Sequence, residues 1–412
     1  MVWSKGACKG LSSDEIDLKI QIFSSDKSLS SLMSIPRLLT ISPGRLVRVT
    51  DADEEVFALY TGLAGSSERA SEFDAAKSEQ ARRHPTQAGS LGFVDSGAST
   101  IGIRLEIRPP TQQAHGQSMT GRNTKKGRKA KTSSSSQGGR EIEVELKQDI
   151  FATKYRSGDT GSLVWRASID FAELLWYELL FPSPHAPSGP GEDEDTCWRG
   201  FLDMARLTES SRILELGAGT GSLAILCAGM FPSASRASWT ASDQFDLLTI
   251  IARNLAHNRI AFSTGSGSQE EPHARYTIEE IDWLAVETQW LKTQGHPRLA
   301  TSEPADCSSK RYDLILAVDC LYNESLILPL LRTIDHFGSV QEEPCSSGVN
   351  GPTLVLVVSE LRSSDVVEAF VRHWLALRPA WTLCRLPIQS LRPELNLNLA
   401  KPRYVVWCGW KN

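Results

Sequence analysis

A glycine-rich turn joins an apolar stretch to the start of a helical pattern in "ILELGAGTGSLAIL", residues 213–226. Glycine has no side chain, so the backbone of such a turn can approach a ligand closely. The dinucleotide fingerprint G-x-G-x-x-G fails here, because its last position is Ser222. Alternating glycines at a strand-to-helix junction are too specific for a turn with no other role. We predict that Gly217, Ala218 and Gly219 bind a small-molecule cofactor.

Two acidic residues near this turn indicate which cofactor it binds. Glu215 stands just before the turn, where a carboxylate would repel a pyrophosphate and would suit a cationic head such as the amino group and sulfonium of S-adenosylmethionine. Asp243 ends the next expected strand, 26 residues after Gly217. A carboxylate there can accept hydrogen bonds from both ribose hydroxyls. The alternative role of Asp243 is to cap the helix that follows, and both roles can hold together.

A second candidate site lies in "YDLILAVDCLYNES", residues 312–325, where an apolar strand pattern ends on an acid. We expect Val318 to contact the adenine end of the cofactor, and Asp319 to point into the cleft. The acid attracts an ammonium group, and the ring of Tyr322 can hold it by a cation–π contact. Many methyltransferases that act on nucleic-acid amino groups carry two prolines at this position, and this chain does not. Asn323 is a candidate cap for the next helix.

The elements that must position these residues follow a regular order. From residue 212 onward, strand-length apolar stretches alternate with helical patterns, until the last two strands follow one another. This order predicts a Rossmann-like α/β fold with seven strands, mostly parallel, helices on both faces and an antiparallel hairpin at one edge. Ligands of such sheets bind beyond the carboxyl ends of the strands. Trp283, at the end of the third strand in "IDW", would then lie beside the adenine, with a core position as an equal alternative.

The first part of the chain predicts a smaller extension. Residues 45–64 read as a short strand and a helix, and residues 101–108 and 140–152 read as two alternating strands that can pair as an antiparallel hairpin. Between them, residues 111–139 are rich in Gln, Ser, Gly and Lys, and we expect a disordered insertion. Its basic run, residues 125–131, favours a solvated tether, with a nuclear address or an RNA contact as alternatives.

We therefore divide the chain into an N-terminal extension (1–110), the insertion (111–139) and a methyltransferase domain (140–412). The formal net charge of −5 gives no basic field for nucleic acid, so direct DNA binding is not expected. The 8 cysteines include no C-x-x-C pair, which disfavours metal sites and disulfides and favours a reducing compartment. Neither a signal peptide nor a membrane span is expected. We expect a monomer in the cytoplasm, with the nucleus as an alternative location.

Four segments together carry a resemblance to a known family: "GDTGSLVWRAS" (158–168), "ILELGAGTG" (213–221), "IDW" (281–283) and "DCLYNESLILPLL" (319–331). The chain resembles the seven-strand protein lysine methyltransferases of the methyltransferase 16 group. The pairs "DQ" and "YN" and the N-terminal "EEVFALYTGL" are similar to the fungal ribosomal lysine methyltransferase 5 family. The insertion and the long connection over 285–311 depart from compact members of the group.

The resemblance implies that Trp165 contacts the cofactor and that Asp319 and Tyr322 lie at the substrate channel. It implies an S-adenosylmethionine-dependent protein-lysine N-methyltransferase, acting on a lysine of a large-subunit ribosomal protein. The alternatives are a lysine of an elongation factor or chaperone, a small-molecule substrate, and a non-catalytic module that only binds the cofactor.

Overall fold

The computed structural model describes residues 35–41, 43–74, 92–110, 139–155, 160–182, 200–264, 274–292, 311–339, 351–391, 395 and 397–411. The expected insertion over 111–139 lies outside the described residues except for Gly139, and the connection over 285–311 lies outside them between 293 and 310.

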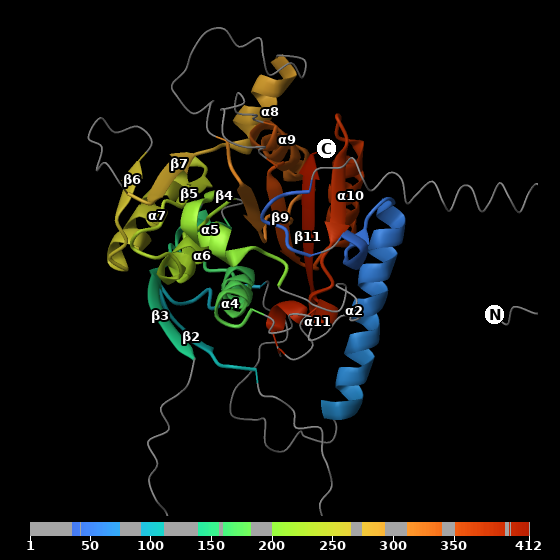
Figure 1. Cartoon of the computed structure of the whole chain (residues 1–412), viewed down its shortest axis with the longest axis horizontal. Helices are drawn as coiled ribbons and strands as arrows, with labels where there is room; N and C mark the ends of the chain where they lie inside the picture. Colours follow the sequence, from blue (N-terminus) through green and yellow to red (C-terminus); the bar gives the residue numbers. More distant parts are fainter. Residues whose placement is uncertain are drawn as a thin grey trace, which may run out of the picture.

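One large sheet organises the fold, with the strand order β1-β10-β11-β9-β8-β4-β5-β7-β6 (Figure 1). The strands that correspond to the predicted seven are β4 (Arg212–Leu216), β5 (Ser238–Asp243), β7 (Tyr276–Glu280), β8 (Leu314–Val318), β9 (Leu354–Glu360), β10 (Trp381–Arg385) and β11 (Tyr404–Lys411). Neighbours from β7 to β9 pair in parallel, and β11 runs antiparallel to both β9 and β10. The predicted α/β fold with an antiparallel last strand is confirmed.

The edges of the sheet differ from the prediction. The last strand, β11, is not at an edge, because it inserts between β9 and β10 and pairs with both. Two short strands extend the sheet to nine: β1 (Val47–Arg48) pairs with β10, and β6 (Phe262–Thr264) pairs with β7. Strand β1 is the short strand expected within residues 45–64, although its place in the large sheet was not predicted. Strand β6 has only three residues, too few to show an apolar pattern in the sequence.

Helices cover both faces of the sheet because strand side chains alternate between two hydrophobic cores. In β4, Ile213 belongs to one core, and Leu214 and Leu216 belong to the other. The first core is covered by α4 (Arg166–Leu180), α6 (Ser222–Cys227) and α7 (Phe245–His257). The second is covered by α9 (Ile327–Gly338) and α10 (Ser364–Ala376), with α8 (Trp283–Lys292) against α9. The shorter helices are α3 (Ala152–Tyr155), α5 (Met204–Ser210) and α11 (Ile388–Leu391).

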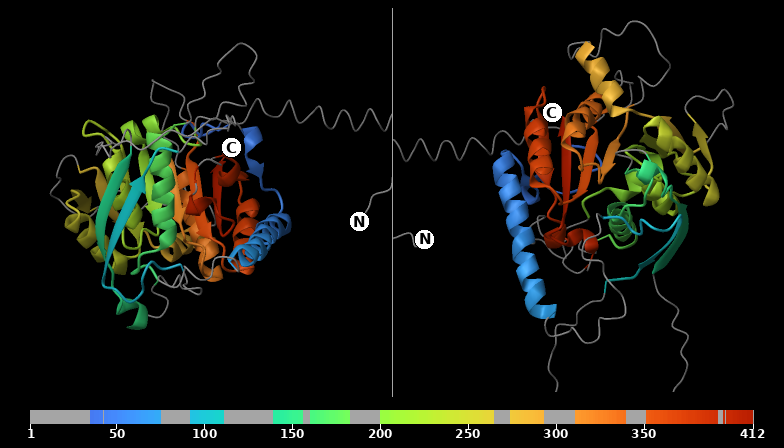
Figure 2. Two further views of the ribbon diagram at one scale, coloured as in Figure 1. Left: turned by 90° about the horizontal axis from the view of Figure 1, so that it is seen from below. Right: turned by 180° about the vertical axis from the view of Figure 1, so that it is seen from behind.

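The predicted hairpin is present as a separate two-stranded sheet, β2 (Thr100–Ile107) and β3 (Arg140–Lys147). It packs beside α4, α6 and α7 (Figure 2). A fully buried side chain, Asn254 of α7, joins it to the glycine turn: its amide donates to the carbonyls of Lys147 (3.0 Å) and Thr220 (2.9 Å). Asn254 therefore links the hairpin to the glycine turn.

The predicted N-terminal helix is α2 (Ala52–Asp74), which lies outside α10 (Figure 1). Its buried Glu55 accepts a hydrogen bond from the indole of Trp407 at 2.9 Å and forms an ion pair with Arg385 at 2.9 Å. A buried carboxylate needs such partners, because an unpaired one is strongly destabilising. The contacts attach α2 to β11 and β10.

Candidate cofactor and substrate pocket

The nine residues predicted to contact the cofactor or the substrate all line one pocket beyond the carboxyl ends of β4, β5 and β8. They are Trp165, Gly217, Ala218, Gly219, Asp243, Trp283, Val318, Asp319 and Tyr322. In a parallel sheet these strand ends meet at one edge, so residues far apart in sequence converge. Their positions are thus established, and their roles stay predictions.

The glycine turn leaves no room for a side chain at Gly217 or Gly219. Gly217 and Gly219 have φ angles of 68° and 56°, in the left-handed region that favours glycine. A Cβ at Gly217 would lie 2.8 Å from the sulfur of Cys320 and 3.2 Å from the ring of Trp283. A Cβ at Gly219 would lie 2.9 Å from the carbonyl oxygen of Gly161. The turn is thus a backbone cradle that only glycine can form.

Asp243 holds this cradle in place. Its Oδ2 accepts the backbone N–H of Gly219 at 2.8 Å, and its Oδ1 accepts the N–H of Gln244 at 2.8 Å. The N-cap position of α7 is occupied by Gln244, and its side chain makes no capping hydrogen bond. Asp243 precedes that position and is therefore not the cap of α7. Asp243 lines the pocket, and contact with ribose hydroxyls remains its predicted role.

Glu215 corrects part of the sequence argument. Its side chain does not line the pocket; it is buried (3% exposed) and accepts a hydrogen bond from the indole of Trp239 at 2.8 Å. Burial raises the pKa of this carboxyl to about 8, the Trp239 bond opposes the rise and the charge of Asp243 adds to it. Strand alternation points Glu215 into the same core as Ile213. The prediction that Glu215 favours a cationic ligand is therefore wrong, because its side chain does not face the pocket.

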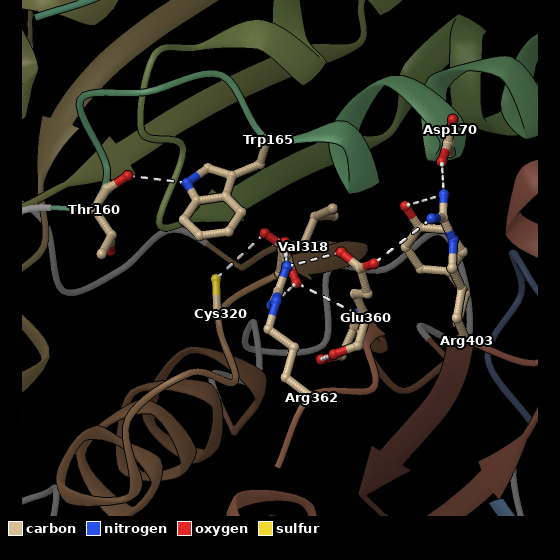
Figure 3. Close-up of polar contacts among 11 residues, drawn as sticks. Thr160, Trp165, Asp170, Val318, Cys320, Glu360, Arg362 and Arg403 are labelled. Atoms are coloured by element: carbon tan, nitrogen blue, oxygen red, sulfur yellow. Dashed lines mark hydrogen bonds and ion pairs between the residues drawn. The ribbon is translucent and has the colours of Figure 1, made fainter. Parts of the chain in front are cut away.

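The two predicted tryptophans come from different elements. Trp165 is the N-cap residue of α4, and its indole donates to the carbonyl of Thr160 at 2.9 Å (Figure 3). Its ring centroid lies 4.2 Å from that of Phe93. Trp283 does not end a strand as expected, because β7 ends at Glu280 and Trp283 begins α8. Both rings nevertheless border the pocket.

Asp319 forms an ion pair that the sequence did not indicate. Its side chain is 1% exposed, and Arg362 binds both carboxylate oxygens, at 2.8 and 2.7 Å. The N–H of Glu360 also donates to it, at 3.3 Å. Asp319 lines the pocket as expected, and its role toward the substrate stays a prediction. Its φ of 61° is uncommon for a residue other than glycine and holds the chain in this turn.

Tyr322 and Asn323 of the "DCLYN" segment lie where the sequence predicts them. Tyr322 is 39% exposed at the pocket wall. Asn323 caps the short helix Glu324–Leu326 by accepting the N–H of Ser325 at 3.1 Å, which confirms the predicted cap.

Sequence reasoning missed other residues around the pocket. Cys320 lies beneath the glycine turn with its thiol directed at the carbonyl of Leu216 (3.4 Å), and burial raises its pKa well above the usual value, so it stays a neutral thiol. Asp282 caps α8 by accepting the N–H of Leu284 at 2.9 Å. Both stand inside motifs that the sequence already marks. Arg362 carries no such signal.

Metal sites and membrane spans are both missing from the part of the chain that the structure describes. The described ranges contain no cluster of three or more His, Cys, Asp or Glu side chains able to hold a metal ion. Nor does any helix among the described residues have the length and apolar character needed to cross a membrane.

Several sequence relatives of the chain are named as lysine methyltransferases, although no protein-family model matches it. The chain is 27% identical over 354 residues to ribosomal lysine N-methyltransferase 5 of Candida glabrata, covering 80% of this chain and 91% of that protein. It is 25% identical to the protein of that name from Zygosaccharomyces rouxii, covering 52% of this chain and 64% of the relative.

Other matches are weaker. Protein-lysine N-methyltransferase EFM3 of Chaetomium thermophilum is 26% identical and covers 52% of this chain and 47% of that protein. Among solved structures, a putative O-methyltransferase from Klebsiella pneumoniae aligns over 64% of this chain and 94% of its own, with 15% identity and a TM-score of 0.29. A TM-score that low does not support a common fold, so the fold assignment rests on the strand order described above. The sequence relatives confirm the resemblance: the chain is a homologue of protein-lysine N-methyltransferases.

Proposed function

We propose that this protein transfers a methyl group from S-adenosylmethionine to the side-chain amine of a lysine in a large-subunit ribosomal protein. The observation that carries the proposal is the convergence of the nine predicted residues on one pocket in a homologue of ribosomal lysine N-methyltransferase 5. The large subunit, the cytoplasmic location and the monomeric state remain predictions.

The residues present fit this cofactor. The backbone of Gly217, Ala218 and Gly219 lines the pocket, and the missing side chains of the two glycines let a ligand approach that backbone closely. Asp243 offers acceptor oxygens at the end of β5, and the rings of Trp165 and Trp283 offer flat apolar faces. When bound, S-adenosylmethionine supplies the electrophilic methyl group.

The chemistry demands a neutral lysine nitrogen. A lysine with a pKa of about 10.4 is roughly 0.1% neutral near about pH 7.4, so deprotonation costs about 4 kcal/mol unless the pocket lowers that pKa. Removal of the amine from water and a neighbouring positive charge both lower it. Orientation of the amine in the pocket contributes further to the rate. No general base is assigned.

The test is a transfer assay with labelled S-adenosylmethionine and intact fungal ribosomal subunits. We expect label in one large-subunit protein, recovered as methyl-lysine after hydrolysis, and none with Asp243→Ala. Label in an elongation factor or chaperone of a cell extract, with ribosomes unlabelled, would favour the alternative substrate. Cofactor binding without transfer to any fraction would favour a non-catalytic module, and label confined to small molecules would exclude a protein substrate.

A further inference from the structure

Arg362 contacts two of the residues that line the pocket, Asp319 and Trp165. Arg362, in the loop after β9, binds Asp319 through both terminal nitrogens and contacts Glu360 at 3.0 Å. Its guanidinium carbon lies 4.9 Å from the centre of the Trp165 ring (Figure 3). Arg362 therefore fixes a predicted substrate residue and a predicted cofactor residue together. A guanidinium can do both because its planar fork matches a carboxylate while its face stacks on a ring.

The guanidinium is itself held firmly. Its side chain is 22% exposed, and a Cβ on Gly92 would come within 2.4 Å of it, so the segment before β2 covers it closely. Burial lowers the pKa of Arg362, but the hydrogen bond and charge of Asp319 and the charge of Glu360 outweigh burial and raise it. Arg362 thus stays positively charged beside the pocket.

Beyond Arg362 the charges continue away from the pocket. Glu360 lies 3.8 Å from Arg403, and Arg403 lies 3.9 Å from Asp170 of α4. Figure 3 shows these side chains in the order Arg362, Glu360, Arg403 and Asp170, with Trp165 beside Arg362. The network ties the end of β9 to α4 and to the start of β11, so Arg362 has little freedom to leave Asp319.

The pairing matters because of what methyl transfer requires. An ionised carboxylate close to an amine favours the ammonium form and raises the amine pKa by about 1–3 units. A free Asp319 would therefore attract the target lysine and also keep it protonated. With Arg362 bound to both oxygens, the pair carries no net charge toward the amine.

The other ionisable groups around the pocket do not replace Asp319. Those that line it are Asp243 at the end of β5, Asp282 before α8, and Cys320 and Tyr322 from the loop after β8. Glu360 of β9 and Tyr404 of β11 face Arg362, and burial raises the pKa of the Tyr404 hydroxyl, so it stays neutral. Glu360 contacts Arg362 and Arg403. Asp243 and Asp282 accept backbone N–H groups, and the thiol of Cys320 is neutral.

We propose that Arg362 is a positioning residue for methyl transfer, which neutralises Asp319 so that the lysine enters without a free carboxylate beside it and loses its proton at lower pH. This inference rests on the proposed function. It assigns Asp319 and Arg362 a joint role as a neutral pair, in place of an acid that waits for an ammonium group.

The experiment measures kcat against pH on the labelled ribosomal substrate for four variants. Arg362→Met keeps the length and removes the charge, and the midpoint of the rise in rate should move up by about 1 pH unit or more. Asp319→Asn removes one of the two carboxylates that contact Arg362 and leaves Glu360, so the site becomes more positive and the midpoint should move down. The double variant Asp319→Asn with Arg362→Met should return to the wild-type midpoint. Arg362→Lys keeps the charge, loses the fork, and should lower the rate with a midpoint near wild type.

Two controls separate position from fold. Arg372→Met removes an exposed arginine that pairs with Asp53 and Glu368 far from the pocket, and it should leave the profile unchanged. The melting temperature and the affinity for S-adenosylhomocysteine are measured for every variant. If Arg362→Met does not fold, the downward movement of the midpoint in Asp319→Asn still tests the pairing.

The outcomes are distinct. Equal midpoints in wild type, Arg362→Met and Asp319→Asn, with rates that only follow the folded fraction, overturn the inference and leave the proposed function intact. Loss of all turnover in Asp319→Asn with cofactor affinity retained also overturns it, because Asp319 would then bind the ammonium itself. If the wild-type protein transfers no methyl group to lysine, the proposed function fails and this inference fails with it.

Discussion

Asp243 accepts the backbone N–H of Gly219 at 2.8 Å, and this bond joins the end of β5 to the glycine turn 24 residues earlier in the chain. The acid thereby shapes the turn before any ligand arrives. A role toward the ribose and a role in holding the turn therefore belong to the same carboxylate, and its loss should affect both.

Asp243→Ala should lower the affinity for S-adenosylhomocysteine by at least about tenfold, which corresponds to about 1.4 kcal/mol. Asp243→Asn keeps an acceptor oxygen for Gly219 and should weaken binding less. Titration calorimetry measures both, with Asp53→Ala, an exposed acid of α2, as the matched control. Unchanged affinity in a folded Asp243→Ala protein would remove the residue from the cofactor site.

Gly219→Ala tests the backbone cradle. The new Cβ would meet the carbonyl oxygen of Gly161 at 2.9 Å, and the φ of 56° is strained for alanine, so we expect a lower melting temperature and loss of cofactor binding. Gly62→Ala is the matched control, because nothing lies within 4 Å of a Cβ there and α2 is helical. It should stabilise the protein by about 0.5–1 kcal/mol. Equal effects of the two substitutions would contradict the cradle.

Glu215→Gln tests the buried carboxyl. Because the folded-state pKa is raised to about 8, the folded protein binds a proton that the unfolded chain has already released. The free energy of unfolding therefore falls as pH rises from about 4.5 to about 8, by about 1.4 kcal/mol for each pH unit between the two pKa values. Glutamine carries no charge to bury, so the stability of the variant relative to wild type should rise over that window. Chemical denaturation at about pH 5 and about pH 8.5 measures the difference; a constant difference would mean that Glu215 stays ionised in the fold.

Tyr322 tests the aromatic wall of the substrate end. Tyr322→Phe keeps the ring and should reduce kcat/KM only a few-fold, whereas Tyr322→Ala should reduce it by about tenfold, as expected when a cation–π contact of about 1–2 kcal/mol is lost. The side chain is 39% exposed, so the melting temperature should change little in either variant. A fall in activity that merely follows a fall in stability would assign the ring to packing alone.

The sequence by itself determined the parts of this protein that depend on local pattern. Alternating glycines permit the left-handed backbone found at Gly217 and Gly219, and the strand patterns before Asp243 and Asp319 place both acids at strand ends. Since parallel strands end at one edge of a sheet, these patterns predicted that the glycine turn, Asp243 and Asp319 meet at one pocket. The position of Trp165 came from the family resemblance. The N-terminal hairpin was likewise readable, because its two strands alternate in the same way.

Tertiary structure decided what each side chain meets there. Glu215 points into the core because side chains alternate between the two faces of β4. Asp319 is paired with Arg362, a residue 43 positions later that no motif marks. The insertion of β11 between β9 and β10 was equally hidden, since strand order depends on which edges pair. A pattern along the chain fixes the spacing and period of its side chains. The charge that a pocket presents depends on partners brought from distant segments, and only packing selects those partners.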